Sequence, residues 1–194
     1  MANICLLRHG QTAWNVEGKW QDHTDIGLNE TGVFQATHIS EALKDQNFEA
    51  IYSSDLGRAY TTAEIINRHH NLTIIKDERL REQNLGNWEG LYVNQIPDLF
   101  PGEWEIFSKD PINTRINGGE SVRDLADRMV EIYQQINRDY PNNVQVLVVA
   151  HGLSLAVLYC EVNGLHLAEA FNLKLENAKP FFLETPLKLK PTAR

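Results

Sequence analysis

The chain has 194 residues, a formal net charge of −8, 42% hydrophobic residues and 23% charged residues. This length predicts one domain with a sizeable core, and the composition is typical of a globular protein. The negative balance excludes a nucleic acid bound on a broad basic surface, so an anionic ligand would need a local cluster of cations.

Nothing in the sequence predicts export, membrane insertion or metal binding. The apolar run at residues 4–7 ends at Arg8 and is too short for a signal peptide or a membrane span. Cys5 and Cys160 lie in apolar surroundings, which favours buried free thiols over a disulfide, and no spacing indicates a zinc site. We therefore expect a cytoplasmic protein without a bound metal or a membrane partner; its oligomeric state is unknown from the sequence.

Strand and helix patterns alternate along the chain, which favours an α/β fold. Helices are expected where Gly32, Ala36, Ile39 and Leu43 form an inner face, from 56 to about 69, from 121 onward, and from about 153 to 162. Strands are predicted at 3–7, 50–53, 72–75, 144–150, 171–175 and 181–184.

Periodicity weakens between residues 82 and 119, where Gly, Pro, Trp and Asn recur. A segment of this length between regular elements usually carries short helices or covers a site. We interpret it as an excursion within a single domain spanning 1–185. The basic tail at 186–194, with its two prolines, is expected to be loose.

Two histidines follow apolar strand-like runs and precede a glycine: His9, beside Arg8, and His151, after Ala150. Ligands of open α/β sheets bind beyond the carboxyl ends of the strands, so these imidazoles could lie close together. An imidazole with one unprotonated nitrogen can attack phosphorus, and an adjacent guanidinium suits phosphate oxygens. Gly10 is expected to allow the backbone to pass close to the ligand.

Three further segments carry candidate groups. Arg58 lies in the first turn of a predicted helix, where the helix terminus also favours an anion. Glu82 and Glu89 are both candidates for the acid that would protonate a leaving oxygen. Trp88 is interpreted as a packing anchor. Local capping is sufficient to explain the turn at 118–121.

Taken together, these segments make the chain resemble the histidine phosphatase superfamily, also called the phosphoglycerate mutase-like family. The resemblance covers nearly the whole chain. It rests on Arg8-His9-Gly10 with Asn15, Ser53-Ser54-Asp55-Leu56-x-Arg58-Ala59, Leu80-Arg81-Glu82 with Gly86-x-Trp88-Glu89-Gly90, Gly119-Glu120-Ser121, and Ala150-His151-Gly152. It implies a three-layer α/β/α sandwich with a mostly parallel central sheet.

The resemblance also implies a mechanism without a cofactor. His9 would be the nucleophile that becomes phosphohistidine, and Glu82 would be the general acid and then the base. The residues implied in binding phosphate or substrate are Arg8, Asn15, Gln21, Arg58, His151 and Gly152. The implied ligand is a small phosphorylated metabolite.

Within this family the sequence favours a phosphatase over a mutase. Mutases typically have Glu-Ser after the first glycine, whereas this chain has Gln11-Thr12, and they have Glu-Arg-His-Tyr-Gly around the acid, whereas this chain has Arg81-Glu82-Gln83-Asn84-Leu85-Gly86. The alternatives are a cofactor-dependent phosphoglycerate mutase and a non-catalytic phosphate-binding module. Broad-specificity, α-ribazole-phosphate and sugar-phosphate phosphatases all remain open. Trp104, Lys109 and Arg115 are candidate substrate contacts in the excursion.

Overall fold

The computed structural model describes residues 1–141 and 143–183. Their centre is a sheet with the strand order β3-β2-β4-β1-β5. The strands are β1 (Asn3–Arg8), β2 (Phe48–Ser53), β3 (Ile74–Lys76), β4 (Gln145–Ala150) and β5 (Pro180–Phe182). All neighbours are parallel except β5, which runs antiparallel along β1. The predicted mostly parallel sheet is confirmed.

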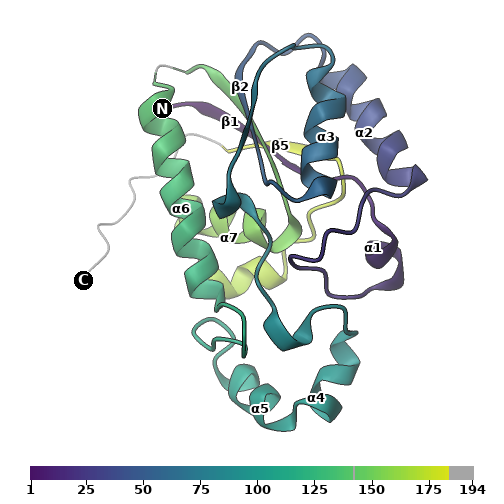
Figure 1. Cartoon of the computed structure of the whole chain (residues 1–194). Coiled ribbons are helices and arrows are strands. Elements are labelled where there is room, and N and C mark those ends of the chain that lie inside the picture. Colours follow the sequence, from purple (N-terminus) through teal and green to yellow (C-terminus); the bar gives the residue numbers. More distant parts are fainter. Residues whose placement is uncertain (142, 184–194) are drawn as a thin grey trace.

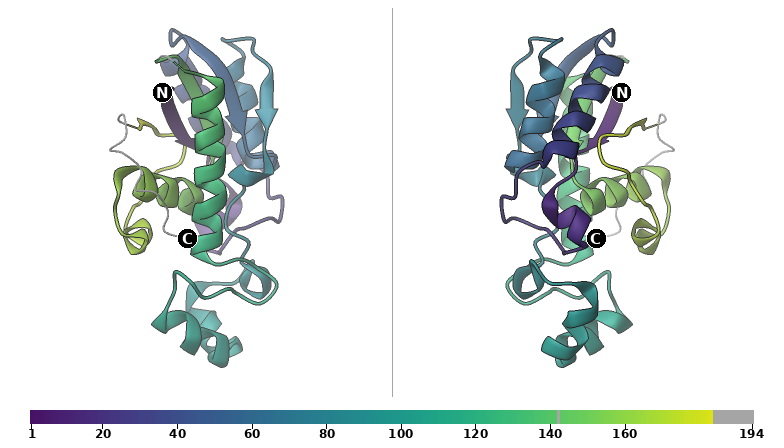
Figure 2. Two further views of the ribbon diagram at one scale, coloured as in Figure 1. Left: turned by 90° about the vertical axis from the view of Figure 1, so that its left-hand side faces the viewer. Right: turned by 90° about the vertical axis from the view of Figure 1, so that its right-hand side faces the viewer.

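Helices cover both faces of the sheet and complete the three layers, as the two side views show (Figure 2). Along β4, Val146 and Val148 belong to the core under α6 and α7, whereas Leu147 and Val149 belong to the core under α2 and α3. Side chains alternate between the two faces of a strand, so a strand buried on both faces needs the continuous apolar run seen here. The helices are α2 (Glu30–Leu43), α3 (Gly57–Asn67), α6 (Val122–Asp139) and α7 (Gly152–Asn163).

The excursion contains short helices at the end of the molecule away from the N-terminus (Figure 1). These are the 3₁₀ helices η2 (Gly86–Trp88) and η3 (Val93–Gln95), followed by α4 (Ile96–Leu99) and α5 (Pro101–Lys109). The fully buried Trp88 packs against Phe107, with ring centroids 5.0 Å apart. Trp88 is therefore the packing anchor that the sequence predicts. The remaining short helices are α1 (Ala13–Glu17) and the 3₁₀ helices η1 (Glu78–Leu80) and η4 (Leu167–Phe171).

Most predicted elements are present within a few residues of their expected bounds. The strand predicted at 171–175 is wrong, because Leu167–Phe171 forms η4 and residues 173–176 are irregular. Leu167 and Ala170 are both buried, and this spacing of three is the period of a 3₁₀ helix rather than of a strand. The last residue of the strand predicted at 181–184 and the tail at 186–194 lie outside the described residues. Cys5 and Cys160 are buried free thiols, as predicted.

The structure gives a reason for glycine at position 10 other than the one expected from the sequence. A Cβ at Gly10 would lie 2.5 Å from the carbonyl oxygen of Gly32, at the start of α2. Glycine is therefore required at this position for the packing of two backbones, and no approach of a ligand is needed to explain it.

Candidate active site

The strand order brings the two motif histidines together. β1 and β4 are parallel neighbours in which Arg8 is paired with Ala150, so the residues that follow both strands emerge side by side. The His9 amide continues the ladder by donating to the Ala150 carbonyl at 3.0 Å. The rings of His9 and His151 lie edge to face with centroids 5.2 Å apart.

His9 is held as a neutral imidazole with a free nitrogen. Its Nδ1 lies 2.7 Å from the Gly10 carbonyl oxygen, which can only accept, so Nδ1 carries the proton and Nε2 keeps its lone pair. Burial and the positive charges of Arg58 and Arg8 lower the pKa of His9 well below its usual value. These are the tautomer and protonation state that a nucleophilic imidazole needs.

Arg58 determines the tautomer of His151 in the opposite sense. The Arg58 Nε donates to Nδ1 of His151 at 3.2 Å, so in the neutral ring the proton lies on Nε2. Burial and the charge of Arg58 lower the pKa of His151 well below its usual value. His151 Nε2 is buried and has no hydrogen-bond partner in the described part of the chain. A buried N–H without a partner is a group that a bound anion would satisfy.

Arg8 provides a second donor of this kind. One terminal nitrogen donates to the Leu175 carbonyl at 2.8 Å, while the buried Nε has no partner among the described residues. A Cβ at Gly152 would lie 3.5 Å from Arg8 Cζ and 3.7 Å from Glu82 Oε2. The guanidinium and the carboxylate thus both lie against Gly152.

The structure separates the two candidate acids. Glu82 lines the same cavity as His9, and its carboxylate accepts from the amides of Gln83, Leu153 and Ser154 at 3.0, 3.0 and 2.9 Å. The last two amides belong to the first turn of α7, where backbone N–H groups lack intrahelical partners. Glu89 does not line this cavity; it accepts from the Thr24 amide and is hydrogen-bonded to Asp22.

Asp22 and Glu89 connect the loop after α1 to the segment that carries Glu82. Asp22 is buried, and its carboxylate accepts from the amides of His23 and Leu85. Burial and the hydrogen bond with Glu89 raise the pKa of Asp22 to about 7. The carbonyl of Asp22 accepts from Arg58, so this carboxyl pair lies directly behind the Arg58 guanidinium.

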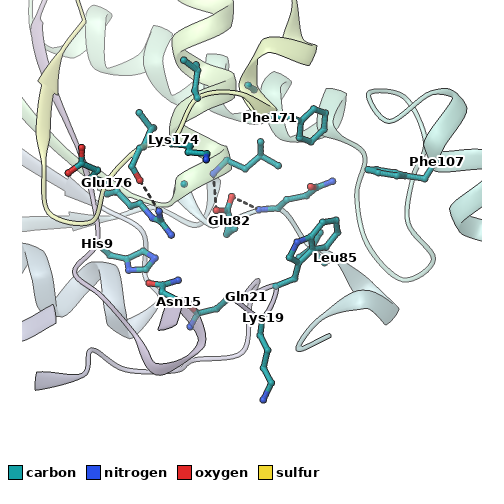
Figure 3. Close-up of a pocket in the computed structure, with 18 residues that line it drawn as sticks. His9, Asn15, Lys19, Gln21, Glu82, Leu85, Phe107, Phe171, Lys174 and Glu176 are labelled. Atoms are coloured by element: carbon teal, nitrogen blue, oxygen red, sulfur yellow. Dashed lines mark hydrogen bonds between the residues drawn. The ribbon is translucent and has the colours of Figure 1, made fainter. Parts of the chain in front are cut away.

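The cavity beside His9 has a volume of about 590 Å³. Asn15 lines it and accepts from the Thr12 amide through Oδ1, which leaves its amide nitrogen to face a ligand. Gln21 accepts from the Thr12 hydroxyl, and its buried Nε2 has no partner in the described chain. Figure 3 shows His9, Asn15 and Gln21 on one side of this space, with Glu82 in the middle and Phe171 and Phe107 opposite.

The lining residues include all the predicted site residues except Arg58 and His151, which lie behind them. The lining residues that sequence analysis missed are mostly apolar. They come from the excursion, the loop between α1 and α2, the start of α7 and the η4 region: Trp20, Leu85, Phe107, Leu153, Ala170, Phe171, Leu173 and Leu175. The cavity is also lined by four polar residues that sequence analysis did not single out as candidates: Lys19, Gln83, Lys174 and Glu176. The η4 region was missed because the alternating apolar residues at 171–175 predict a strand.

The excursion contacts predicted from sequence differ from those observed. Phe107 lines the cavity, whereas Lys109 pairs with Glu105. Arg115 pairs with Asp124, and Trp104 packs in the aromatic cluster around Trp88. Lys109 lies two residues after the buried Phe107, and this spacing places it on the opposite, exposed side of α5.

In residues 1–141 and 143–183, no cluster of three or more His, Cys, Asp or Glu side chains could hold a metal ion. No helix in this described part of the chain is long and apolar enough to cross a membrane.

Comparisons with known proteins agree with this geometry. The profile of the histidine phosphatase superfamily (branch 1) matches residues 4–185. The chain is 37% identical to the uncharacterized phosphatase PhoE of Bacillus subtilis, over 84% of this chain and 79% of that protein. It is 35% identical to the probable phosphoglycerate mutase GpmB of Shigella boydii, over 91% of this chain and 82% of that one.

Among solved structures, the mycobacterial glucosyl-3-phosphoglycerate phosphatase in complex with VO3 aligns with a TM-score of 0.82 and 34% identity, covering 94% of this chain and 92% of that one. The profile match spans both histidine motifs, the Arg58 helix and the Glu82 segment. The chain therefore belongs to the histidine phosphatase superfamily.

Proposed function

We propose that this protein is a phosphatase that hydrolyses the phosphomonoester of a small metabolite through a phosphohistidine on His9. The observation that carries the proposal is the pairing of opposite tautomers: His9 presents a lone pair on Nε2, and His151 presents an N–H beside it. A nucleophile adjacent to unpartnered donors suits attack on a phosphoryl group whose oxygens those donors would bind.

In the first step, His9 Nε2 forms a bond to phosphorus while the bond from phosphorus to the leaving oxygen breaks. Glu82, in its protonated form, transfers a proton to that oxygen, so the alcohol leaves neutral. In the second step Glu82 accepts a proton from water, the resulting hydroxide attacks phosphorus, and His9 is released. Phosphate leaves, and the enzyme returns to its starting state.

The remaining residues would bind the phosphoryl group. Arg8 and His151 each offer a buried donor without a partner in the described part of the chain, and Asn15 and Gln21 add amide donors from the wall of the cavity. Arg58 would act partly through His151, because its Nε orients that ring. Preorganised donors of this kind stabilise charge on a transferred group without reorganisation during the reaction.

The test is hydrolysis of p-nitrophenyl phosphate by the wild type and by His9→Ala. We expect turnover in the wild type, an acid-labile phosphoenzyme on rapid quenching, and loss of both in His9→Ala. The matched control is His38→Ala, an exposed histidine on α2 that should leave activity unchanged. Turnover that survives His9→Ala would remove His9 from the mechanism, and phosphate binding without any turnover would favour a non-catalytic module.

A cofactor-dependent phosphoglycerate mutase is the second candidate, favoured by the 35% identity to the probable mutase GpmB. A mutase must keep water from its phosphoenzyme, whereas a phosphatase must admit it. The two activities are separated by incubating the enzyme with 3-phosphoglycerate and a bisphosphoglycerate primer. Release of phosphate faster than formation of 2-phosphoglycerate supports the phosphatase, and the reverse result supports the mutase.

A further inference from the structure

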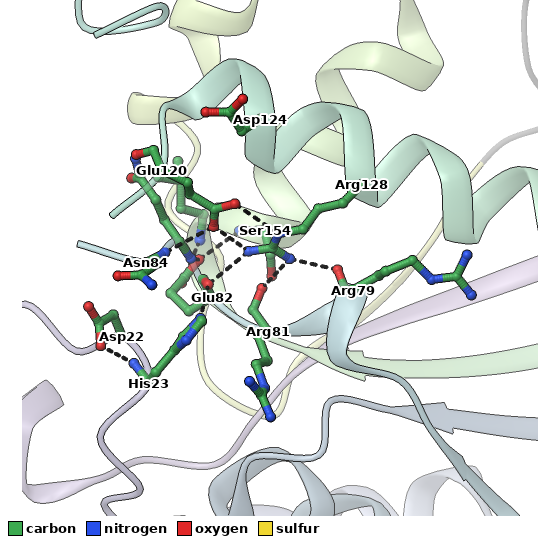
Figure 4. Close-up of polar contacts among 12 residues, drawn as sticks. Asp22, His23, Arg79, Arg81, Glu82, Asn84, Glu120, Asp124, Arg128 and Ser154 are labelled. Carbon is green, nitrogen blue, oxygen red and sulfur yellow. Dashed lines mark hydrogen bonds and ion pairs between the residues drawn. The ribbon is translucent and has the colours of Figure 1, made fainter. Parts of the chain in front are cut away.

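Arg128, in the middle of α6, uses every N–H of its guanidinium within the protein. One terminal nitrogen donates to the carbonyls of Arg79 and Arg81 at 2.6 and 2.8 Å. The other donates to the Glu82 carbonyl at 2.8 Å and to Glu120 at 2.6 Å, and Nε donates to Glu120 at 3.1 Å. Figure 4 shows this side chain reaching from the helix to the backbone of the 79–82 segment.

Glu120 extends the same network to the other side of Glu82. One carboxylate oxygen of Glu120 accepts from the Asn84 amide at 2.9 Å as well as from Arg128. The carbonyl of Glu120 accepts from the Gln83 side chain at 3.0 Å. The backbone is therefore held on both sides of the residue that follows Glu82. Ser121 caps α6 with Asp124, as the sequence predicts, but capping does not account for Glu120.

This support matters because the backbone around Glu82 is irregular. After η1 ends at Leu80, no helix or strand is present until Gly86. Backbone groups in such a segment have no partners from a helix or a sheet. Arg128 donates from α6 to three carbonyls in residues 79–82, and Glu120, just before that helix, accepts from the Asn84 amide. The Arg128 and Glu120 side chains are only 19% and 16% exposed, so water competes weakly for these contacts.

We propose that Arg128, together with Glu120, positions Glu82 for proton transfer to the leaving oxygen. The inference rests on the proposed function, because it assigns Arg128 a task in that reaction. Arg128 does not line the cavity and is a positioning residue: it acts on the main chain of Glu82, while the start of α7 holds the carboxylate. Catalytic groups require placement to within about 0.5 Å, which an unsupported loop does not provide.

The variant Arg128→Lys removes the planar fork while keeping a positive charge beside Glu120. A lysine has three donors on one atom and cannot reach three carbonyls and a carboxylate together. The matched control is Arg123→Lys, which alters an exposed arginine of the same helix that makes one ion pair with Glu161. Glu120→Gln is a milder variant that keeps an acceptor for the Asn84 amide.

The readout is kcat/KM for two phosphomonoesters, which covers the steps up to release of the alcohol. An alkyl phosphate needs a proton on its leaving oxygen, whereas 2,4-dinitrophenyl phosphate releases a stable phenolate. For Arg128→Lys we expect kcat/KM to fall about 10- to 100-fold with the alkyl substrate, because a misplaced Glu82 transfers its proton poorly. With the dinitrophenyl ester, kcat/KM should fall less than about 3-fold. Glu120→Gln should show a smaller loss with the same selectivity, and Arg123→Lys should show none.

Glu82→Gln distinguishes failure of this inference from failure of the proposed function. Glu82→Gln is expected to show the leaving-group dependence. If it does, but Arg128→Lys and Glu120→Gln lose kcat/KM equally with both substrates, or lose it with neither, the positioning role is wrong and the proposed function stands. If Glu82→Gln itself shows no leaving-group dependence, the role of Glu82 is wrong and the inference is overturned with it. If Arg128→Lys does not fold, Glu120→Gln tests the positioning role instead: a larger loss of kcat/KM with the alkyl phosphate than with the dinitrophenyl ester supports it, and equal losses contradict it.

Discussion

The variant Glu89→Gln is expected to reduce a pH dependence of stability that the wild type has, because it removes the contribution of Glu89 and leaves the burial of Asp22 unchanged. In the folded protein, burial and the hydrogen bond with Glu89 raise the pKa of Asp22 from 3.8 to about 7. The folded state therefore binds more protons than the unfolded state between these values. Stability falls as pH rises from about 4 to about 7, and above that range this contribution is fully lost.

The size of the fall follows from the two pKa values. The difference between 3.8 and about 7 corresponds to at most about 4 kcal/mol. Glu89 is only half-buried, so water screens the pair, and we expect a fall of roughly 1–2 kcal/mol. In Glu89→Gln the amide nitrogen donates to an ionised Asp22, and the amide oxygen keeps the bond from the Thr24 amide. Repulsion between two carboxylates is then absent.

The assay is the free energy of unfolding in urea, measured at about pH 5 and about pH 8 for both proteins. The difference between wild type and variant should change by up to about 1–2 kcal/mol across this range, to the disadvantage of the wild type at high pH. Comparison with Glu49→Gln, an exposed carboxylate on β2, removes the effect of overall charge. Parallel pH profiles for wild type and Glu89→Gln, within about 0.5 kcal/mol, would refute the reasoning.

Three further outcomes follow from the geometry. Burial and two guanidinium groups lower the pKa of His9, so ¹⁵N NMR should show a titration midpoint well below the ordinary value of 6.5 and, in the neutral ring, the proton on Nδ1. A midpoint near 6.5 would contradict this. Gly10→Ala places a Cβ 2.5 Å from the Gly32 carbonyl oxygen and should lower the free energy of unfolding in urea by about 1–3 kcal/mol. In the control Gly102→Ala the new Cβ has no heavy atom within 4 Å, so stability should change by no more than about 1 kcal/mol. Trp88→Phe should lower the free energy of unfolding by about 1–2 kcal/mol. The loss is modest because the indole N–H is buried without a hydrogen-bond partner among the described residues. A loss above about 3 kcal/mol would show that this N–H does have a partner.

The sequence was most informative where local patterns coincide with buried structure. The run at 144–150 predicts a strand covered on both faces, and β4 is that strand. The spacing of apolar residues after Ser121 predicts the buried face of α6, including Leu125, Met129 and Ile132. The strand at 171–175 was mispredicted because Leu173 and Leu175 alternate with polar residues, which is the pattern of a strand. The structure instead has η4 up to Phe171, with Leu167 and Ala170 in the same core cluster as residues of α7.

The sequence by itself determined the elements and the residue types available for chemistry, because hydrophobic periodicity and strand-end motifs are local signals. Only the tertiary structure placed β4 beside β1, which brings His151 to His9, and showed that Glu82 lines the cavity whereas Glu89 does not. The opposite tautomers of the two histidines, and the support of Glu82 by Arg128, depend on hydrogen bonds between residues far apart in the chain. Such contacts arise from packing of distant segments, and no local pattern in the sequence encodes them.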